Sequence, residues 1–195
     1  MHYVIWGAAE LPADVARTSG AQALAGGDML VLEGPWPLGP TALAYLADDK
    51  GLAAFRAKAS ATSGAFAVEG LAAPDAGGAF VVAAHRMLDP DGFRPYADAI
   101  PDLLRRFGAR VLARGGTITH LAGDFAPDRG VVLEFASAEA AVAFYTSEVY
   151  APLLRLRWRT TDPRFVILTR AGTLPAALRA RAEDFLRAHG RPAAG

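Results

Sequence analysis

The sequence predicts an α+β fold in which short strands and helices alternate through two successive halves of the chain. Strand-length runs of apolar and β-branched residues recur along the 195 residues, separated by segments with helical periodicity. Hydrophobic residues make up 52% of the chain and charged residues 21%, a composition that can form a core. The stretch Gly130–Tyr145 also aligns without a gap to Thr41–Arg56, 89 residues earlier. This offset indicates an internal repeat.

The second half has the clearer signals, and its elements follow the order β-α-β-β-α-β. Four runs rich in Val, Ile, Leu and Phe predict strands at 80–88, 109–123, 131–136 and 164–172. Apolar residues at three- and four-residue steps predict helices at 93–108 and 140–157.

Turn and cap residues place the ends of these elements. Asp89 and Ser137 are suitable N-caps for the two helices, and Gly108 is a natural C-terminal stop. Pro101 should kink or interrupt the first helix because proline has no amide donor. The pair Gly115–Gly116 should bend the long second strand. A break in the second helix is expected before Pro152.

The first half repeats this order in a shortened form. Strands are predicted at 3–9, 28–34, 42–48 and 65–71, with a brief helix and loop over 11–27 and a helix over 50–61. Between Gly26 and Arg56 the constant offset of 89 matches Gly26 with Gly115 and Gly27 with Gly116. We interpret the chain as a duplication. The predicted units are a degenerate module (1–71), a linker (72–79), a second module (80–172), and a C-terminal helix with a tail (173–195).

The order β-α-β-β-α-β is that of the split, ferredoxin-like arrangement, an antiparallel four-stranded sheet with both helices on one face. The other face of such a sheet needs a cover, and an equivalent sheet can provide it. We therefore expect two ferredoxin-like modules that form a pseudo-dimeric α/β barrel within one chain. A monomer with internal pseudo-two-fold symmetry, or a homodimer of it, fits this arrangement.

Residues 80–172 resemble a family of small bacterial proteins, the "domain of unknown function 1330" family of the dimeric α/β-barrel superfamily. The resemblance lies in the segments 80–116, 121–154 and 155–157. It implies a ferredoxin-like fold and sheet-to-sheet pairing, and no established reaction. The superfamily also includes small monooxygenases, haem-handling proteins and isomerases of aromatic breakdown. Residues 1–71 depart strongly from the family pattern.

Composition and motifs disfavour several classes of function. Twenty basic residues balance twenty acidic ones, so no net charge favours nucleic acid or an anionic membrane. No cysteine is present, the four histidines lack a paired metal spacing, and no nucleotide-binding or serine-hydrolase motif occurs. No signal peptide or membrane-length apolar run is apparent, so a cytoplasmic protein is expected. The sequence indicates no metal and identifies no cofactor.

Polar residues found only in the second copy rank the candidates for a site. His85 aligns with Ala8 and Glu134 with Tyr45. A histidine at a strand end can act as a general base or remain a structural residue. By alternation, Glu134 should face the other sheet, where a carboxylate needs a partner or a raised pKa. We consider His85 and Glu134 as catalytic candidates, with a structural ion pair as the alternative for Glu134.

Three further residues are candidates for substrate binding. Tyr96 and Tyr145 lie on predicted helices, where aromatic residues more often belong to the core. Arg157 could hold an anionic substrate or be a solvated or capping residue.

Two hypotheses of function follow. The first is a small-molecule enzyme or binder with its pocket in the second module, suited to proton transfer or cofactor-free oxygenation of a small, partly aromatic acid. The second is a non-catalytic scaffold or interaction module whose barrel interior is filled by Trp6, Tyr45 and Phe125. Whether the protein is an enzyme stays open at this point.

Overall fold

The computed structural model describes residues 1–58 and 64–190, which form ten β-strands and six α-helices. The strands are β1 (His2–Trp6), β2 (Gln22–Ala25), β3 (Met29–Glu33), β4 (Ala42–Leu46), β5 (Ala65–Glu69), β6 (Ala79–Met87), β7 (Arg110–Arg114), β8 (Ile118–Ala122), β9 (Arg129–Phe135) and β10 (Thr161–Thr169). The helices are α1 (Ala13–Ser19), α2 (Asp49–Arg56), α3 (Pro90–Arg106), α4 (Ala138–Tyr145), α5 (Ala151–Thr160) and α6 (Ala176–His189).

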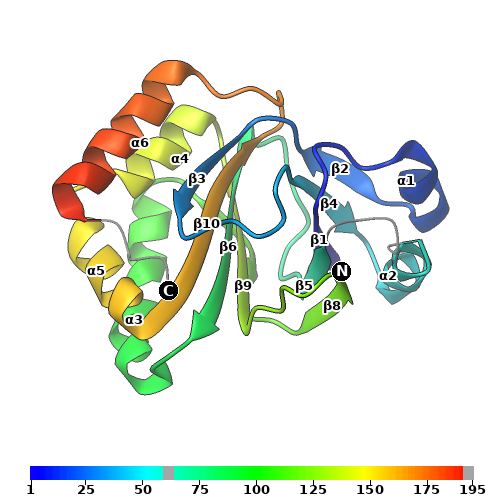
Figure 1. Ribbon diagram of the computed structural model, residues 1–195, viewed down its shortest axis with the longest axis horizontal. Coiled ribbons are helices and arrows are strands. Elements are labelled where there is room, and N and C mark those ends of the chain that lie inside the picture. Colours follow the sequence, from blue (N-terminus) through cyan, green and yellow to red (C-terminus); the bar gives the residue numbers. More distant parts are fainter. Residues whose placement is uncertain (59–63, 191–195) are drawn as a thin grey trace.

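The strands form two antiparallel five-stranded sheets. The first sheet has the order β2-β4-β1-β5-β8, and the second sheet has the order β3-β10-β6-β9-β7. The sheets pack face to face between two layers of helices (Figure 1). Helices α3 to α6 cover the outer face of the second sheet, and α1 and α2 cover that of the first. The α+β class predicted from the sequence is thus confirmed.

Each sheet is completed by one strand from the other half of the chain. Strand β3 pairs with β10, and β8 pairs with β5. The crossings occur at the two glycine pairs, where Gly27 and Gly115 have φ angles of 73° and 68°. Such positive values favour glycine, and they turn the chain out of one sheet and into the other. The bend predicted at Gly115–Gly116 is therefore confirmed.

This exchange corrects two expectations. Each sheet has five strands instead of four, because it gains an edge strand from the other half. The closed barrel is wrong, since the two sheets are separate hydrogen-bonded ladders that meet through side chains.

The caps form as the sequence indicates. Asp89 accepts a hydrogen bond from Gly92 N at 2.9 Å, and Ser137 accepts one from Ala140 N at 3.3 Å. The break before Pro152 is confirmed by the end of α4 at Tyr145 and the start of α5 at Ala151. Two details differ from the prediction. Helix α3 continues through Pro101, and the loop predicted over 11–27 contains β2.

Side-chain alternation divides the core between the two faces of the second sheet. On β6, Ala79, Val81 and Ala83 face the helices, whereas Phe80 and Val82 face the first sheet. Bulky residues from both sheets fill the space between them, including Tyr3, Ile5, Leu24, Leu43, Phe66 and Phe80.

The residues predicted to fill the interior are divided between two cores. Tyr45 and Phe125 pack against the inter-sheet core, as expected. Trp6 lies on the opposite face of the first sheet, with its ring 5.3 Å from that of Phe55.

The offset of 89 residues reappears in the structure. Strands β3 and β8 begin and end 89 positions apart, and so do helices α2 and α4. The end of the helix predicted to Ala61 and the predicted C-terminal tail lie outside the described residues. Among the described helices, none has the length and apolarity needed to cross a membrane.

Candidate functional site

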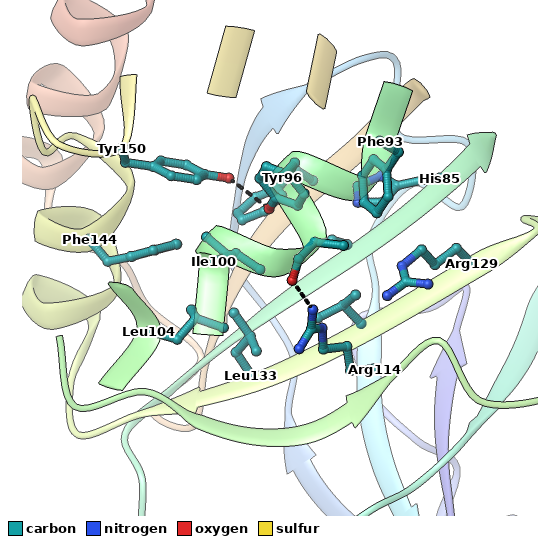
Figure 2. Close-up of a pocket in the computed structure, with 14 residues that line it drawn as sticks. His85, Phe93, Tyr96, Ile100, Leu104, Arg114, Arg129, Leu133, Phe144 and Tyr150 are labelled. Atoms are coloured by element: carbon teal, nitrogen blue, oxygen red, sulfur yellow. Dashed lines mark hydrogen bonds between the residues drawn. The ribbon is translucent and has the colours of Figure 1, made fainter. Parts of the chain in front are cut away.

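A small pocket lies between α3 and the helix-covered face of the second sheet (Figure 2). Its volume of about 30 Å³ has room for about two water molecules at ~10–15 Å³ each. Apolar and aromatic side chains form most of its wall, while the polar lining comes from His85, Tyr96, Arg114, Arg129 and Tyr150. The pocket therefore has an apolar body with a few polar groups, the usual character of a small-molecule site.

Strand register places three of the polar residues side by side. His85 on β6 lies directly opposite Arg129 on β9, and Arg114 on β7 lies opposite Val131. Because residues two apart on a strand share a face, Arg129 and Val131 both point toward α3. Arg114 is thus a diagonal neighbour of Arg129, within reach of a long side chain. In Figure 2 both guanidinium groups point toward the space beneath α3.

Arg114 also connects the sheet to α3. Pro101 lacks an amide hydrogen, so the carbonyl of Ala97, four residues earlier, cannot form its usual helical bond. Arg114 Nη2 donates to this carbonyl oxygen at 2.5 Å. Pro101, which was expected to interrupt the helix, therefore leaves the Ala97 carbonyl free to accept from Arg114. This hydrogen bond fixes the arginine at the pocket wall.

Aromatic side chains line the pocket along α3 and the segment before α5. The hydroxyl groups of Tyr96 and Tyr150 are 3.4 Å apart, and the Tyr96 ring is 5.0 Å from that of Phe93. Tyr150 is buried, with its ring 4.7 Å from the ring of Phe144, whereas Tyr96 is half-buried. Tyr96 is therefore the tyrosine that stands closer to solvent.

His85 is 2% exposed, and its Nδ1 atom has no hydrogen-bond partner within residues 1–58 and 64–190. Burial holds the pKa of His85 well below its ordinary value, and the positive charges of Arg157 and Arg129 lower it further. The imidazole is therefore neutral at neutral pH. It can exchange a hydrogen bond with a ligand, but protonation beside two arginines is unfavourable.

A buried polar cluster adjoins the pocket. Arg157 on α5 pairs with Glu33 on β3, and both side chains have 0% exposure. Tyr145 donates to Glu33 Oε1 at 2.6 Å. Burial opposes the charge of Arg157, but the Glu33 carboxylate raises the pKa of the guanidinium above its ordinary value. The Arg157 guanidinium lies 5.8 Å from the ring centre of Tyr96, which connects this cluster to the pocket.

Glu134 lies elsewhere. It pairs with Phe80 and faces the first sheet, as alternation predicts, whereas His85 faces α3. Five residue positions separate the two along the paired strands, roughly 17 Å. Glu134 Oε2 accepts from Arg110 Nη1 at 2.5 Å, and Oε1 accepts from the backbone amides of Asp75 and Gly77 at 3.0 Å. This carboxylate fixes the segment that joins the two halves.

The five predicted site residues thus occupy three places. His85 and Tyr96 line the pocket, Tyr145 and Arg157 belong to the adjoining cluster, and Glu134 holds the connecting segment. His85 and Glu134, the two catalytic candidates, do not share a site. They lie on opposite faces of one sheet, because an odd number of residue positions separates them along the paired strands and side chains alternate between the faces.

Sequence reasoning missed Arg114, Arg129 and Glu33. The comparison of the two halves contained a signal for each, since at the offset of 89 Arg129 corresponds to Pro40 and Arg114 to Ala25. Glu33 corresponds to Ala122, so it is a polar residue of the first half alone. It was missed because polar residues were sought in the second half.

The described residues contain no group of three His, Asp or Glu side chains placed to hold a metal ion. The pocket can instead bind through hydrogen bonds, through two guanidinium groups and through its aromatic walls. The arrangement defines an α+β protein with a small, arginine-bearing pocket beneath a helix.

Comparison with known families gives the particular assignment. Residues 78–171 match the model of the family described as Domain of unknown function (DUF1330). This half of the chain is therefore a DUF1330 domain, in agreement with the resemblance found in the sequence. None of the curated proteins matches the chain significantly.

Proposed function

We propose that the protein binds a small organic molecule in the pocket beneath α3. The observation that carries the proposal is the composition of the wall, where buried His85 and two arginines meet an otherwise apolar cavity of aliphatic and aromatic side chains. A buried polar nitrogen without a partner among the described residues costs free energy unless a ligand or water satisfies it. A bound molecule with an acceptor or donor near His85 Nδ1 would remove that cost.

A role in catalysis would rest on His85 and not on the pair His85–Glu134. Glu134 is separated from the pocket by the sheet. It already accepts hydrogen bonds from three donors, which are the amides of Asp75 and Gly77 and the guanidinium of Arg110. A neutral His85 can orient a substrate or accept a proton transiently, as proton transfer or cofactor-free oxygenation of a small acid would require. Binding is the part of this hypothesis that the pocket supports best.

A cavity-filling variant tests the proposal. Ala97 lines the pocket on α3, so Ala97→Leu should fill it, whereas Ala99→Leu on the exposed part of the same helix should not. We expect small aromatic probes to shift NMR signals of pocket residues in the wild type and in Ala99→Leu. Ala97→Leu should abolish these shifts. Probe binding that is unchanged in Ala97→Leu would refute the proposal.

The filled space between the sheets favours a second candidate, a non-catalytic scaffold. On this view the helix-side pocket holds only water, and the fold serves contact with another protein. Failure of every probe in the experiment above, with the protein folded, would favour this candidate.

We also propose that the chain derives from two ferredoxin-like units, with residues 1–71 and 80–172 as the modules. The equal offsets of β3 and β8 and of α2 and α4 support this. Residues 72–79 would then be the former junction and 173–195 an addition. Since exchange of β3 and β8 already joins the modules, a monomer is expected, and sedimentation equilibrium would distinguish it from a homodimer.

A further inference from the structure

Among the described residues, no carboxylate pairs with either of the two arginines of the pocket. Within the described parts of the chain, neither Arg114 nor Arg129 forms an ion pair, whereas the charge of Arg157 is met by Glu33. The acidic side chain next in sequence, Asp128, points elsewhere and accepts a hydrogen bond from the Met87 amide at 2.9 Å. The pocket therefore has an excess of positive charge at one end.

Arg129 is held in place before any ligand arrives. Its guanidinium carbon lies 5.4 Å from the ring centre of Phe93, and its Nη1 packs where a side chain on Gly115 would otherwise stand. Burial lowers the pKa of Arg129, and the neighbouring charge of Arg114 lowers it further. Two like charges in a half-buried site are costly, so an anion between them would be bound favourably.

The rest of the wall determines what the anion must carry. The rest of the wall that the structure describes includes the rings of Tyr96, Phe144, Tyr150 and Phe165 and has no further cationic side chain, while Phe93 lies beside Arg129. Such a surface is suited to an aromatic or compact apolar group and would desolvate a second charge. A single charged group at one end of the ligand therefore matches the pocket.

We infer that the pocket takes a small aromatic monocarboxylate, with its carboxylate held by Arg129 and Arg114 and its ring beneath α3. This inference rests on the proposed function and adds the class of ligand and the residues that select it. Arg157, the arginine that the sequence suggested for this role, keeps Glu33 as its partner.

A ligand of this kind is larger than the present cavity of about 30 Å³, so one wall moves when it binds. Tyr96 is the part of the wall best able to do so, because it is half-buried and its hydroxyl contact with Tyr150 is long, at 3.4 Å. Arg114 keeps its bond to Ala97 O through Nη2, which leaves its other nitrogen atoms for the carboxylate.

Benzoate and benzamide test the inference because they have nearly the same shape and differ in charge. Binding is measured by calorimetry and by NMR at constant ionic strength, with the full chain. We expect benzoate to bind at least about tenfold more tightly than benzamide, since charge-assisted bidentate bonds are roughly twice as strong as neutral ones. Acetate, which has the charge without the ring, should bind at least about tenfold more weakly than benzoate.

Variants test whether Arg129 causes the preference for benzoate over benzamide. Arg129→Gln should remove the preference for benzoate, and Arg129→Lys should retain part of it, which guards against a loss of folding in the first variant. Arg86→Gln is the matched control, because Arg86 follows His85 on β6 but is exposed. It should leave the preference unchanged.

The outcomes separate the inference from the proposal on which it rests. If benzamide binds as tightly as benzoate, or acetate as tightly as benzoate, the ligand class is wrong while the pocket stands. The same conclusion follows if the preference survives in Arg129→Gln. If neither aromatic probe binds, or if both bind Ala97→Leu unchanged, the proposed function itself is refuted.

Discussion

Glu33 and Arg157 are two charged side chains that lie fully inside the protein. Removing both charges from water is costly, and their mutual attraction, with the Tyr145 hydroxyl donating to Glu33, offsets that cost. Glu33 belongs to the exchanged strand β3, and Arg157 to α5. The pair therefore specifies how the first half of the chain attaches to the helices of the second.

Replacement of Glu33 by glutamine should be strongly destabilising. Glu33→Gln keeps the shape but leaves the Arg157 charge buried without a counter-ion, for which we expect a loss of about 3–5 kcal/mol in the free energy of unfolding. Urea denaturation measures it, with the exposed residue Glu10 changed to glutamine as the control. The double variant Glu33→Leu, Arg157→Met should be more stable than Glu33→Gln. A loss in Glu33→Gln of less than about 1 kcal/mol, the range of a surface pair, would contradict this account.

His85 should make the stability of the protein depend on pH. The groups facing it that carry or can gain charge are Arg129 from β9, Arg157 from α5, Arg114 from β7 and Tyr96 from α3. Burial and the arginines lower the pKa of His85 in the folded state, whereas in the unfolded chain it is about 6.5. Below that pH the unfolded state binds a proton that the folded state does not, so stability falls as the pH is lowered.

The expected loss is at most about 1.4 kcal/mol per pH unit below the unfolded value. Denaturation curves of the wild type and of His85→Gln between about pH 7 and pH 5 provide the measurement. The wild type should lose up to about 2 kcal/mol more than the variant over this range. Parallel losses in the two proteins would show that His85 is not held neutral.

At the scale of elements, α3 is the helix that forms the roof of the pocket. Its 17 residues include two internal prolines, and it nevertheless continues to Arg106. The missing bond at Pro101 is compensated from outside the helix, since Arg114 of β7 donates to Ala97 O. The position of the roof therefore depends on a contact between the helix and the sheet.

A pair of substitutions tests this compensation. Arg114→Met should leave the Ala97 carbonyl without its donor and reduce stability by about 1–3 kcal/mol. Adding Pro101→Ala supplies a backbone amide to the same carbonyl, so the double variant should recover most of the loss. The free energies of unfolding of the four proteins form a double-mutant cycle. Equal losses in Arg114→Met with and without Pro101→Ala would exclude the compensation.

The sequence predicted the elements better than their pairing. Caps such as Asp89 and Ser137 and the glycine pair at 115–116 act locally, so pattern and turn chemistry are sufficient to locate them. Which sheet a strand joins after such a bend depends on distant partners, and this is why the exchange of β3 and β8 was not foreseen. The prediction of the site was incomplete for the same reason, because Glu33 contacts Arg157 only through that exchange.

At the scale of the whole molecule, the two halves are interlocked. The second sheet needs β3 at its edge, and its inner face, with Phe80, Val82 and Val166, needs the first sheet as cover. The DUF1330 match covers residues 78–171. This segment contains neither β3 nor the first sheet, apart from its edge strand β8.

We therefore expect residues 78–195 alone not to fold. The fragment should lack a cooperative thermal transition by circular dichroism and give poorly dispersed amide NMR signals, because it exposes a large apolar sheet face. Coexpression with residues 1–77 should restore the native spectrum. A fragment that unfolds cooperatively by itself would show that the family domain is independent.

The pairing of β3 with β10 also has a consequence for synthesis of the chain. Met29–Glu33 leaves the ribosome early, but Thr161–Thr169, its partner strand, is among the last segments made. Until β10 is made, the backbone groups of β3 have no partner strand and its apolar residues are exposed. Such a segment can associate with other nascent chains. The acidic residues Asp28, which precedes this segment, and Glu33, which ends it, would oppose such association. The yield of native protein would thus depend on how fast the second half is translated, or on a chaperone that binds β3 during that time.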